Sequence, residues 1–130
     1  MDKDQLIKLL NYALQFEYGD IFLYPREANG IKDKKIARIF EEFGLMEIRH
    51  ADMLAVSILK LGGKPVWDFK LLGNLSDLQE ILKKHENNEK LAIDLYQNLI
   101  DRVDDAEIKI ILRGIKAEEE MHLARLRELL

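Results

Sequence analysis

Apolar residues recur along the chain at intervals of three and four positions, which is the spacing of one face of an α-helix. No stretch shows the strict alternation of a β-strand. The four predicted helices run from Asp2-x-x-Gln5 to about Asn29-Gly30, from Asp33 to Gly62-Gly63, from Ser76-x-x-Gln79 to about Arg102, and from Asp104-x-x-Glu107 to the C-terminus. Helices of this length are typical of a bundle, so we predict an all-α four-helix bundle that occupies residues 1–130 as one domain.

The connections between these helices predict their directions. Few residues separate the first helix from the second and the third from the fourth, so each pair is expected to form an antiparallel hairpin. Residues 63–75 lie between the second and third helices. At about 3.3 Å per residue this segment can reach roughly 43 Å, and a helix of about 28 residues is about 42 Å long. We therefore predict a long crossover that starts the third helix at the opposite end of the bundle, parallel to the second.

A glutamate interrupts the apolar face of each predicted helix near its middle. These glutamates are Glu17, Glu47, Glu89 and Glu119, and the second and fourth helices add His50 and His122. A Glu-x-x-His spacing places both side chains on one helix face, one turn apart, where they can bind one ion. The six residues are therefore candidate metal ligands.

The same pattern occurs twice in the chain. Adding 72 to the numbers of the first set of residues gives the second set: Glu17, Tyr24, Glu47 and His50 become Glu89, Tyr96, Glu119 and His122. We therefore expect one helix hairpin to be used twice, with an approximate two-fold axis between the halves.

Charge is the physical reason to expect metal among these residues. Buried carboxylates without partners are costly, and four of them in one core repel one another. No Lys or Arg shares their helix faces, whereas two divalent cations would balance four carboxylates. The sequence contains no cysteine, which excludes disulfides, thiolate zinc sites, iron–sulfur clusters and thiol catalysis. Oxygen ligands with one histidine per ion suit two ions of iron or manganese, or a mixed pair, and make zinc the weaker candidate.

A Glu from each of two helices and a Glu-x-x-His from each of the other two is the ligand pattern of ferritin-like di-iron and di-manganese proteins. Over nearly all its length the chain resembles this superfamily, on the side of rubrerythrins and bacterioferritins. The segment Glu47–Pro65, EIRHADMLAVSILKLGGKP, resembles the second helix of bacterioferritins and its exit. Tyr24 and Tyr96 resemble the tyrosines that hydrogen-bond metal-bound glutamates in rubrerythrins.

The resemblance implies a ferritin-like bundle in which Fe(II) reduces peroxide or O₂, that is, a rubrerythrin-like oxidoreductase. The alternative is an iron-binding, ferroxidase-type protein that handles iron rather than turning over an oxidant.

Three departures from the family bear on these two possible functions. Without cysteine the chain has no rubredoxin-type iron, so electrons are expected from an external donor or from Fe(II) itself. Ile48 stands where bacterioferritins hold haem with a methionine, so no haem is expected. The sequence ends with the fourth helix and lacks the short fifth helix of cage-forming relatives, so a storage shell is not expected; a homodimer is expected because bundles of this family often pair.

Several side chains near the candidate ligands have two readings. Glu86 could replace Glu89 as the ligand of the third helix or add to it, but its counterpart 72 residues earlier is Leu14, so we favour Glu89. His85 is expected to be hydrogen-bonded near the edge of the core, or else to be an additional ligand one turn from Glu89.

Asp20 is expected to be solvated, or else to hydrogen-bond a metal-bound histidine. Glu118 and Glu120, on either side of Glu119, are expected to point outward. Tyr24 and Tyr96 are either plain core aromatics or, as we favour, hydrogen-bond donors to ligand carboxylates, because a buried phenol needs a partner.

Charge and hydropathy limit the partners. Twenty Lys and Arg against 24 Asp and Glu give a net charge of −4, which argues against nucleic acid. No apolar stretch approaches the length of a membrane span. The first residues, MDKDQL, do not resemble a signal peptide, so a cytoplasmic location is expected.

Overall fold

The computed structural model describes residues 1–68 and 77–130. It contains four helices, α1 (Lys3–Ala28), α2 (Lys34–Lys60), α3 (Leu78–Arg102) and α4 (Ala106–Leu129). No strand occurs among the described residues. The predicted all-α, four-helix architecture is confirmed.

An aspartate precedes each helix and accepts a hydrogen bond from a backbone N–H of the first turn; these residues are Asp2, Asp33, Asp77 and Asp105. Such N-caps satisfy amide groups that have no partner within the helix. Asp2 and Gln5 form the predicted capping box.

The predicted starts of the last two helices are wrong by one residue. The carboxylate of Asp77 caps α3 at the N–H of Glu80, and the expected cap Ser76 lies outside the described residues. Asp105, rather than Asp104, caps α4, because its carboxylate accepts the N–H groups of Glu107 and Ile108.

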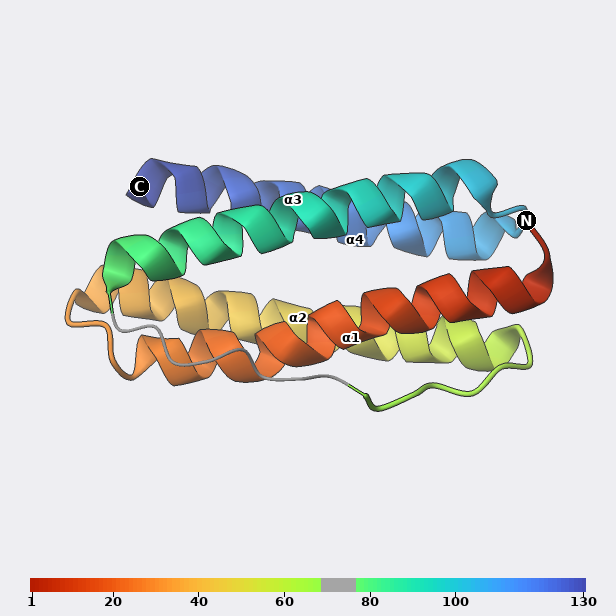
Figure 1. The fold of residues 1–130 in the computed structure, drawn as a ribbon, viewed down its shortest axis with the longest axis horizontal. Coiled ribbons are helices and arrows are strands. Elements are labelled where there is room, and N and C mark those ends of the chain that lie inside the picture. The colour runs from red at the N-terminus through yellow and green to blue at the C-terminus, as the bar shows by residue number, and fades with distance from the viewer. Residues whose placement is uncertain (69–76) are drawn as a thin grey trace.

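The helices pack as two hairpins, α1 against α2 and α3 against α4, and α1 also packs on α3 and α2 on α4. Figure 1 shows that α2 and α3 run in the same direction, so that α3 begins at the end of the bundle opposite to the one where α2 ends. The predicted long connection between parallel helices is confirmed. At the exit of α2 the chain turns through Gly62, whose φ of +82° is readily adopted only by glycine.

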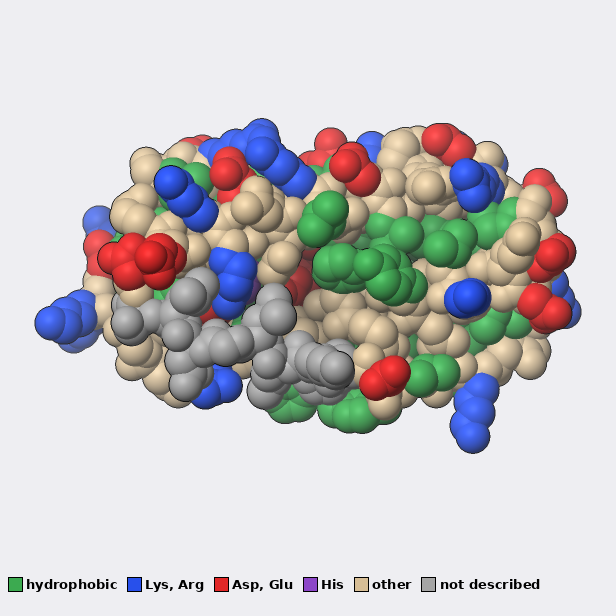
Figure 2. Space-filling model, viewed as in Figure 1, with side chains coloured by type: hydrophobic (Ala, Val, Ile, Leu, Met, Phe, Trp, Pro, Cys, Tyr) green, Lys and Arg blue, Asp and Glu red, His purple; other side chains and the backbone are tan. Residues whose placement is uncertain are grey.

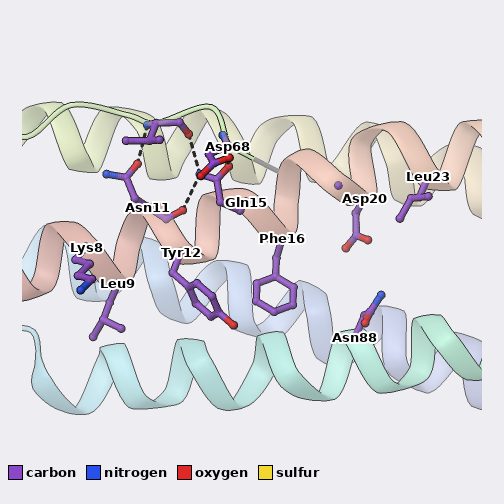
Figure 3. A pocket seen from close by; sticks show the side chains of 12 residues that line it. Lys8, Leu9, Asn11, Tyr12, Gln15, Phe16, Asp20, Leu23, Asp68 and Asn88 are labelled. Carbon is purple, nitrogen blue, oxygen red and sulfur yellow. Dashed lines mark hydrogen bonds between the residues drawn. The ribbon is translucent and has the colours of Figure 1, made fainter. Parts of the chain in front are cut away.

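Two amide side chains of α1 hold the first part of the crossover against that helix (Figure 3). Asn11 donates to the carbonyl of Lys64 at 3.0 Å and accepts the N–H of Val66 at 2.8 Å. One turn later, Gln15 donates to the carbonyl of Val66 at 2.7 Å and accepts the N–H of Asp68 at 2.8 Å. These four bonds direct the chain along α1.

The buried apolar residues form two clusters, one toward each end of the bundle. One cluster is built around Leu10, Leu54, Leu99 and Leu112. The other contains Tyr24, Phe40, Phe43, Leu82 and Leu126. On every helix the predicted Glu and His positions fall between these two clusters, so a polar layer crosses the middle of the core.

A close contact between α1 and α2 at Gly44 gives a test of this packing. A Cβ on Gly44 would lie 2.9 Å from Pro25 Cγ, whereas one on Gly114, in α4, would meet nothing within 4 Å. We expect Gly44→Ala to reduce the free energy of unfolding by about 1–3 kcal/mol because the helices must separate. Gly114→Ala should increase it by about 0.5–1 kcal/mol, since alanine favours helix. Urea unfolding of both variants measures this; an equal effect of the two substitutions would contradict the described packing.

Candidate metal centre

The six candidate ligands converge in the polar layer at the middle of the bundle. Each of Glu17, Glu47, His50, Glu89, Glu119 and His122 is at most 1% exposed. They form two groups whose ligand atoms lie within 4.8 Å of one another: Glu17, Glu47, His50 and Glu119 in one, and Glu47, Glu89, Glu119 and His122 in the other. Glu47 and Glu119 belong to both groups, as carboxylates that bridge two ions would.

Both histidines direct Nδ1 into the cluster. His50 Nδ1 lies 2.8 Å from Glu119 Oε1 and 3.5 Å from Glu17 Oε2. His122 Nδ1 lies 3.2 Å from Glu47 Oε1 and 3.9 Å from Glu89 Oε1. Each histidine therefore contacts glutamates of both halves of the chain.

The cluster leaves many buried polar atoms without hydrogen bonds. They are Glu17 Oε2, both oxygens of Glu47 and of Glu119, Glu89 Oε2, and Nδ1 of His50 and His122. Buried polar atoms in proteins nearly always have a partner. Four carboxylates and two imidazoles fit a pair of divalent cations in both charge and donor chemistry.

Burial and mutual repulsion determine how these acids hold protons in the absence of cations. Burial, together with the negative charge of Glu17, raises the pKa of Glu47 well above its ordinary value. Burial and the charges of Glu47 and Glu89 do the same to the pKa of Glu119. Burial alone would lower the pKa of His50, but its contacts with Glu119 and Glu17 raise it to about 10. Without metal the cluster therefore retains protons, which bound cations must displace.

Two buried tyrosines hold the glutamates that belong to one group only. The Tyr24 hydroxyl donates to Glu89 Oε1 at 2.8 Å, and the Tyr96 hydroxyl donates to Glu17 Oε1. Each tyrosine therefore orients the glutamate of the other half of the chain. The second oxygen of each glutamate has no hydrogen bond and is left for an ion.

Glu86 and His85 lie outside both groups. Glu86 accepts a hydrogen bond from Arg127 at 3.1 Å on the outer side of the bundle. His85 is fully buried, stacks on Tyr24 with 4.1 Å between ring centroids, and contacts Glu27 through Nε2 at 2.5 Å. The structure therefore places His85 in a hydrogen-bonded position beside the cluster, and Glu89 rather than Glu86 within it.

Two expectations about charged neighbours are wrong. Asp20 is only 7% exposed, because it occupies the inward face of α1 one turn from Glu17. Burial, followed by the charges of Glu89 and Glu17, raises its pKa well above the ordinary value. Glu118 does not simply point outward, because its carboxylate lies 3.1 Å from Nε2 of His50. Glu120 is exposed, as expected.

A groove of about 910 Å³ leads toward Asp20 from the surface between α1 and α3 (Figure 3). Its wall includes Leu9, Tyr12 and Phe16, and Asn88 faces Asp20 from α3. Figure 2 shows hydrophobic side chains gathered along this side of the molecule. The groove therefore joins an apolar wall to a buried carboxylate next to the candidate ligands.

Comparison with known proteins places this arrangement in a family. The chain belongs to the Ferritin family, because residues 7–130 match its ferritin-like domain. Among curated proteins, none matches the chain. Of the described helices, none is both long and apolar enough to cross a membrane.

Solved structures of ferritin-like proteins resemble the whole bundle. A ferritin-like diiron-carboxylate protein from Bacillus anthracis is 28% identical over 100% of this chain and 99% of that one, with a TM-score of 0.92. The bacterioferritin-related dodecameric thioferritin of Bacteroides fragilis is 28% identical over 98% and 85%, with a TM-score of 0.89. Rhodobacter capsulatus bacterioferritin, described with a metal-free dinuclear site and haem iron, is 28% identical over 98% and 84%, with a TM-score of 0.83. The predicted ferritin-like fold is thus confirmed.

The raised pKa of Glu47 predicts that this metal-binding candidate lowers the stability of the metal-free protein at neutral pH. In the unfolded chain this carboxyl group ionises near 4.5, but in the metal-free folded chain it stays protonated to higher pH. The metal-free protein therefore loses stability as pH rises from 4.5 toward the raised pKa. Glu47→Gln removes this loss, so at neutral pH we expect its metal-free Tm to exceed that of the unchanged protein by at least about 3 °C, which corresponds to roughly 1 kcal/mol.

Thermal unfolding in chelator at pH 5 and pH 8 measures this difference in Tm, which should be larger at pH 8. After metal loading without chelator, elemental analysis should show fewer ions per chain in Glu47→Gln than in the unchanged protein. Glu42→Gln, an exposed position on α2, is the matched control and should change neither quantity. A metal-free Glu47→Gln protein less stable than the unchanged protein at pH 8 would show that the ionised cluster is not under strain.

Proposed function

We propose that this protein binds two iron ions and acts as a non-haem di-iron oxidoreductase that reduces peroxide or O₂. The observation that carries the proposal is the set of buried, unpartnered carboxylate and imidazole atoms in two groups that share Glu47 and Glu119. Diiron-carboxylate chemistry in the similar protein from Bacillus anthracis supports iron over other metals. A manganese pair or a mixed pair is the alternative metal content.

The protein's own residues supply the positions and exclude water. Glu47 and Glu119, which belong to both ligand groups, would hold the ions together with His50 and His122, and Glu17 and Glu89 would complete the two groups. Tyr96 and Tyr24 hold the last two in place. Two Fe(II) ions held there would supply the electrons that reduce the oxidant. The burial of all six side chains keeps bulk water away from them.

The groove between α1 and α3 is the access route we propose. Its apolar wall suits the passage of O₂, and at its inner side the negative charges that raise the pKa of Asp20 would attract an entering cation. Asp20 lies beside Glu17 and Glu89, whose charges contribute to its raised pKa. The negative potential of the site therefore extends into the groove.

The remaining partners follow from composition. The chain has no cysteine and cannot hold a thiolate-ligated iron, so repeated turnover needs an external electron donor. Ile48, half exposed on α2, has no atom that can bind haem iron, and we propose no haem. We further propose a cytoplasmic protein that forms a homodimer and has no nucleic-acid or membrane partner.

Iron handling without turnover is the second candidate function. It is favoured by the likeness to a bacterioferritin-related thioferritin and to a bacterioferritin. The same ligand groups would then hold Fe(II) as a substrate while O₂ or peroxide oxidises it, and the iron would pass on rather than stay as a cofactor.

Stopped-flow oxidation separates the two candidates. Protein loaded anaerobically with Fe(II) is mixed with peroxide or O₂, with and without an added reductant. Repeated consumption of oxidant with unchanged protein-bound iron is the result we expect. One oxidation per iron followed by iron accumulation would support iron handling instead.

Glu119→Ala should abolish oxidation because it removes a carboxylate shared by both groups, while Glu120→Ala, at an exposed neighbouring position, should leave it unchanged. Failure of the unchanged protein to oxidise Fe(II) with either oxidant would refute both functions.

A further inference from the structure

The two ligand groups have the same types of ligand but differ in the residue that contacts Nε2 of each histidine. Residues 72 positions apart supply equivalent glutamates, tyrosines and histidines to the two halves. Each histidine presents Nδ1 to the cluster, which leaves Nε2 to meet a residue of the neighbouring helix. That residue is different in each half.

Behind His50 stands a carboxylate that is itself held in place. Nε2 of His50 lies 3.1 Å from Glu118 Oε2. Nη2 of Arg49 donates to both oxygens of the same carboxylate, at 2.9 and 2.8 Å. Glu118 is therefore fixed between an arginine on its outer side and the histidine on its inner side.

Behind His122 stands a thioether. Nε2 of His122 lies 3.2 Å from Sδ of Met46, the residue 72 positions before Glu118. The counterpart of Arg49 in this half is Met121. The ring of Phe43 stacks on His122 at 4.0 Å, whereas Ile115 holds the matching position in the other half.

This difference changes the imidazole as a ligand. A histidine that binds metal through Nδ1 carries its proton on Nε2, so Nε2 must donate to whatever faces it. A carboxylate is a strong acceptor that fixes the ring and makes the ligating nitrogen more basic. A thioether is a weak acceptor. Loss of such an outer partner typically costs about 10- to 100-fold in metal affinity.

We propose that Glu118 is a positioning residue that makes the two halves of the site unequal, so that the group containing His50 binds a divalent cation before the group containing His122. The proposal rests on the proposed function, since it assumes that the two groups bind metal. Arg49 supports the effect by holding Glu118. The His122 half is then the one that releases and rebinds its ion more readily.

Site-resolved occupancy tests the proposal without any activity measurement. The metal-free protein is given one equivalent of Mn²⁺ and crystallised, and anomalous scattering at the manganese edge reports the occupancy of each group. Electron paramagnetic resonance of free Mn²⁺ during titration gives the two affinities. We expect the His50 group to be filled first and to bind about 10-fold or more tightly.

A matched set of variants exchanges Glu118 and Met46, the residues that contact Nε2 of the two histidines. Glu118→Met makes the His50 half like the other and should bring the two occupancies together. Met46→Glu should do the same by strengthening the His122 half. The double variant should reverse the order of filling, which a general loss of stability could not produce. Glu120→Met, an exposed change in the same turn of α4, should leave the order unchanged.

The outcomes separate this proposal from the proposed function. Equal partial occupancy of the two groups at one equivalent of Mn²⁺ in the unchanged protein would overturn the role of Glu118 and leave the di-metal function standing. An order of filling that stays the same in the double variant would also overturn it. No Mn²⁺ bound in either group would overturn both.

Discussion

Mutual repulsion among four buried carboxylates is the constraint on which the rest of this structure depends. Glu17, Glu47, Glu89 and Glu119 are nearly inaccessible to water and are packed between two apolar clusters. Two tyrosine hydroxyls and two imidazoles face them, and those partners leave six carboxylate oxygens without hydrogen bonds. Such a layer weakens the core unless protons or cations neutralise it. In the absence of metal, these buried acids therefore lower the free energy of unfolding at the same positions that could bind metal.

Most of the site could be predicted from sequence because it follows helical periodicity. The glutamates lie at core positions of long helices, and the repeat at 72 residues identifies their partners in the other half. The distinction between Glu89 and Glu86 followed from the same repeat. Contacts across helices were not predictable in this way. The bond between His50 and Glu118 joins residues 68 positions apart and depends on how α2 faces α4. The only signal in the sequence was that Glu118 and Met46 break the repeat.

Asp20 shows a second limit of the sequence. Its place on the inward face of α1 was evident, but a charged residue at the edge of an apolar face is usually solvated. Its burial depends on tertiary packing, since Asn88 of α3 faces it across the groove (Figure 3). A similar reason applies to the helix starts, since several neighbouring residues can cap and only the turn geometry selects Asp77 and Asp105.

The family assignment and the structural likenesses establish a ferritin-like bundle. Binding of a metal pair by the two ligand groups would explain why the core of this bundle contains buried acids. The most direct test of that explanation is an anaerobic titration of the metal-free protein with Fe(II), followed by both the ions bound and the Tm. The account predicts two ions per chain, protons released on binding, and a higher Tm with each ion, because bound cations stabilise the folded state. Binding of no iron, or saturation that leaves the Tm unchanged, would contradict the claim that cations hold these acids together.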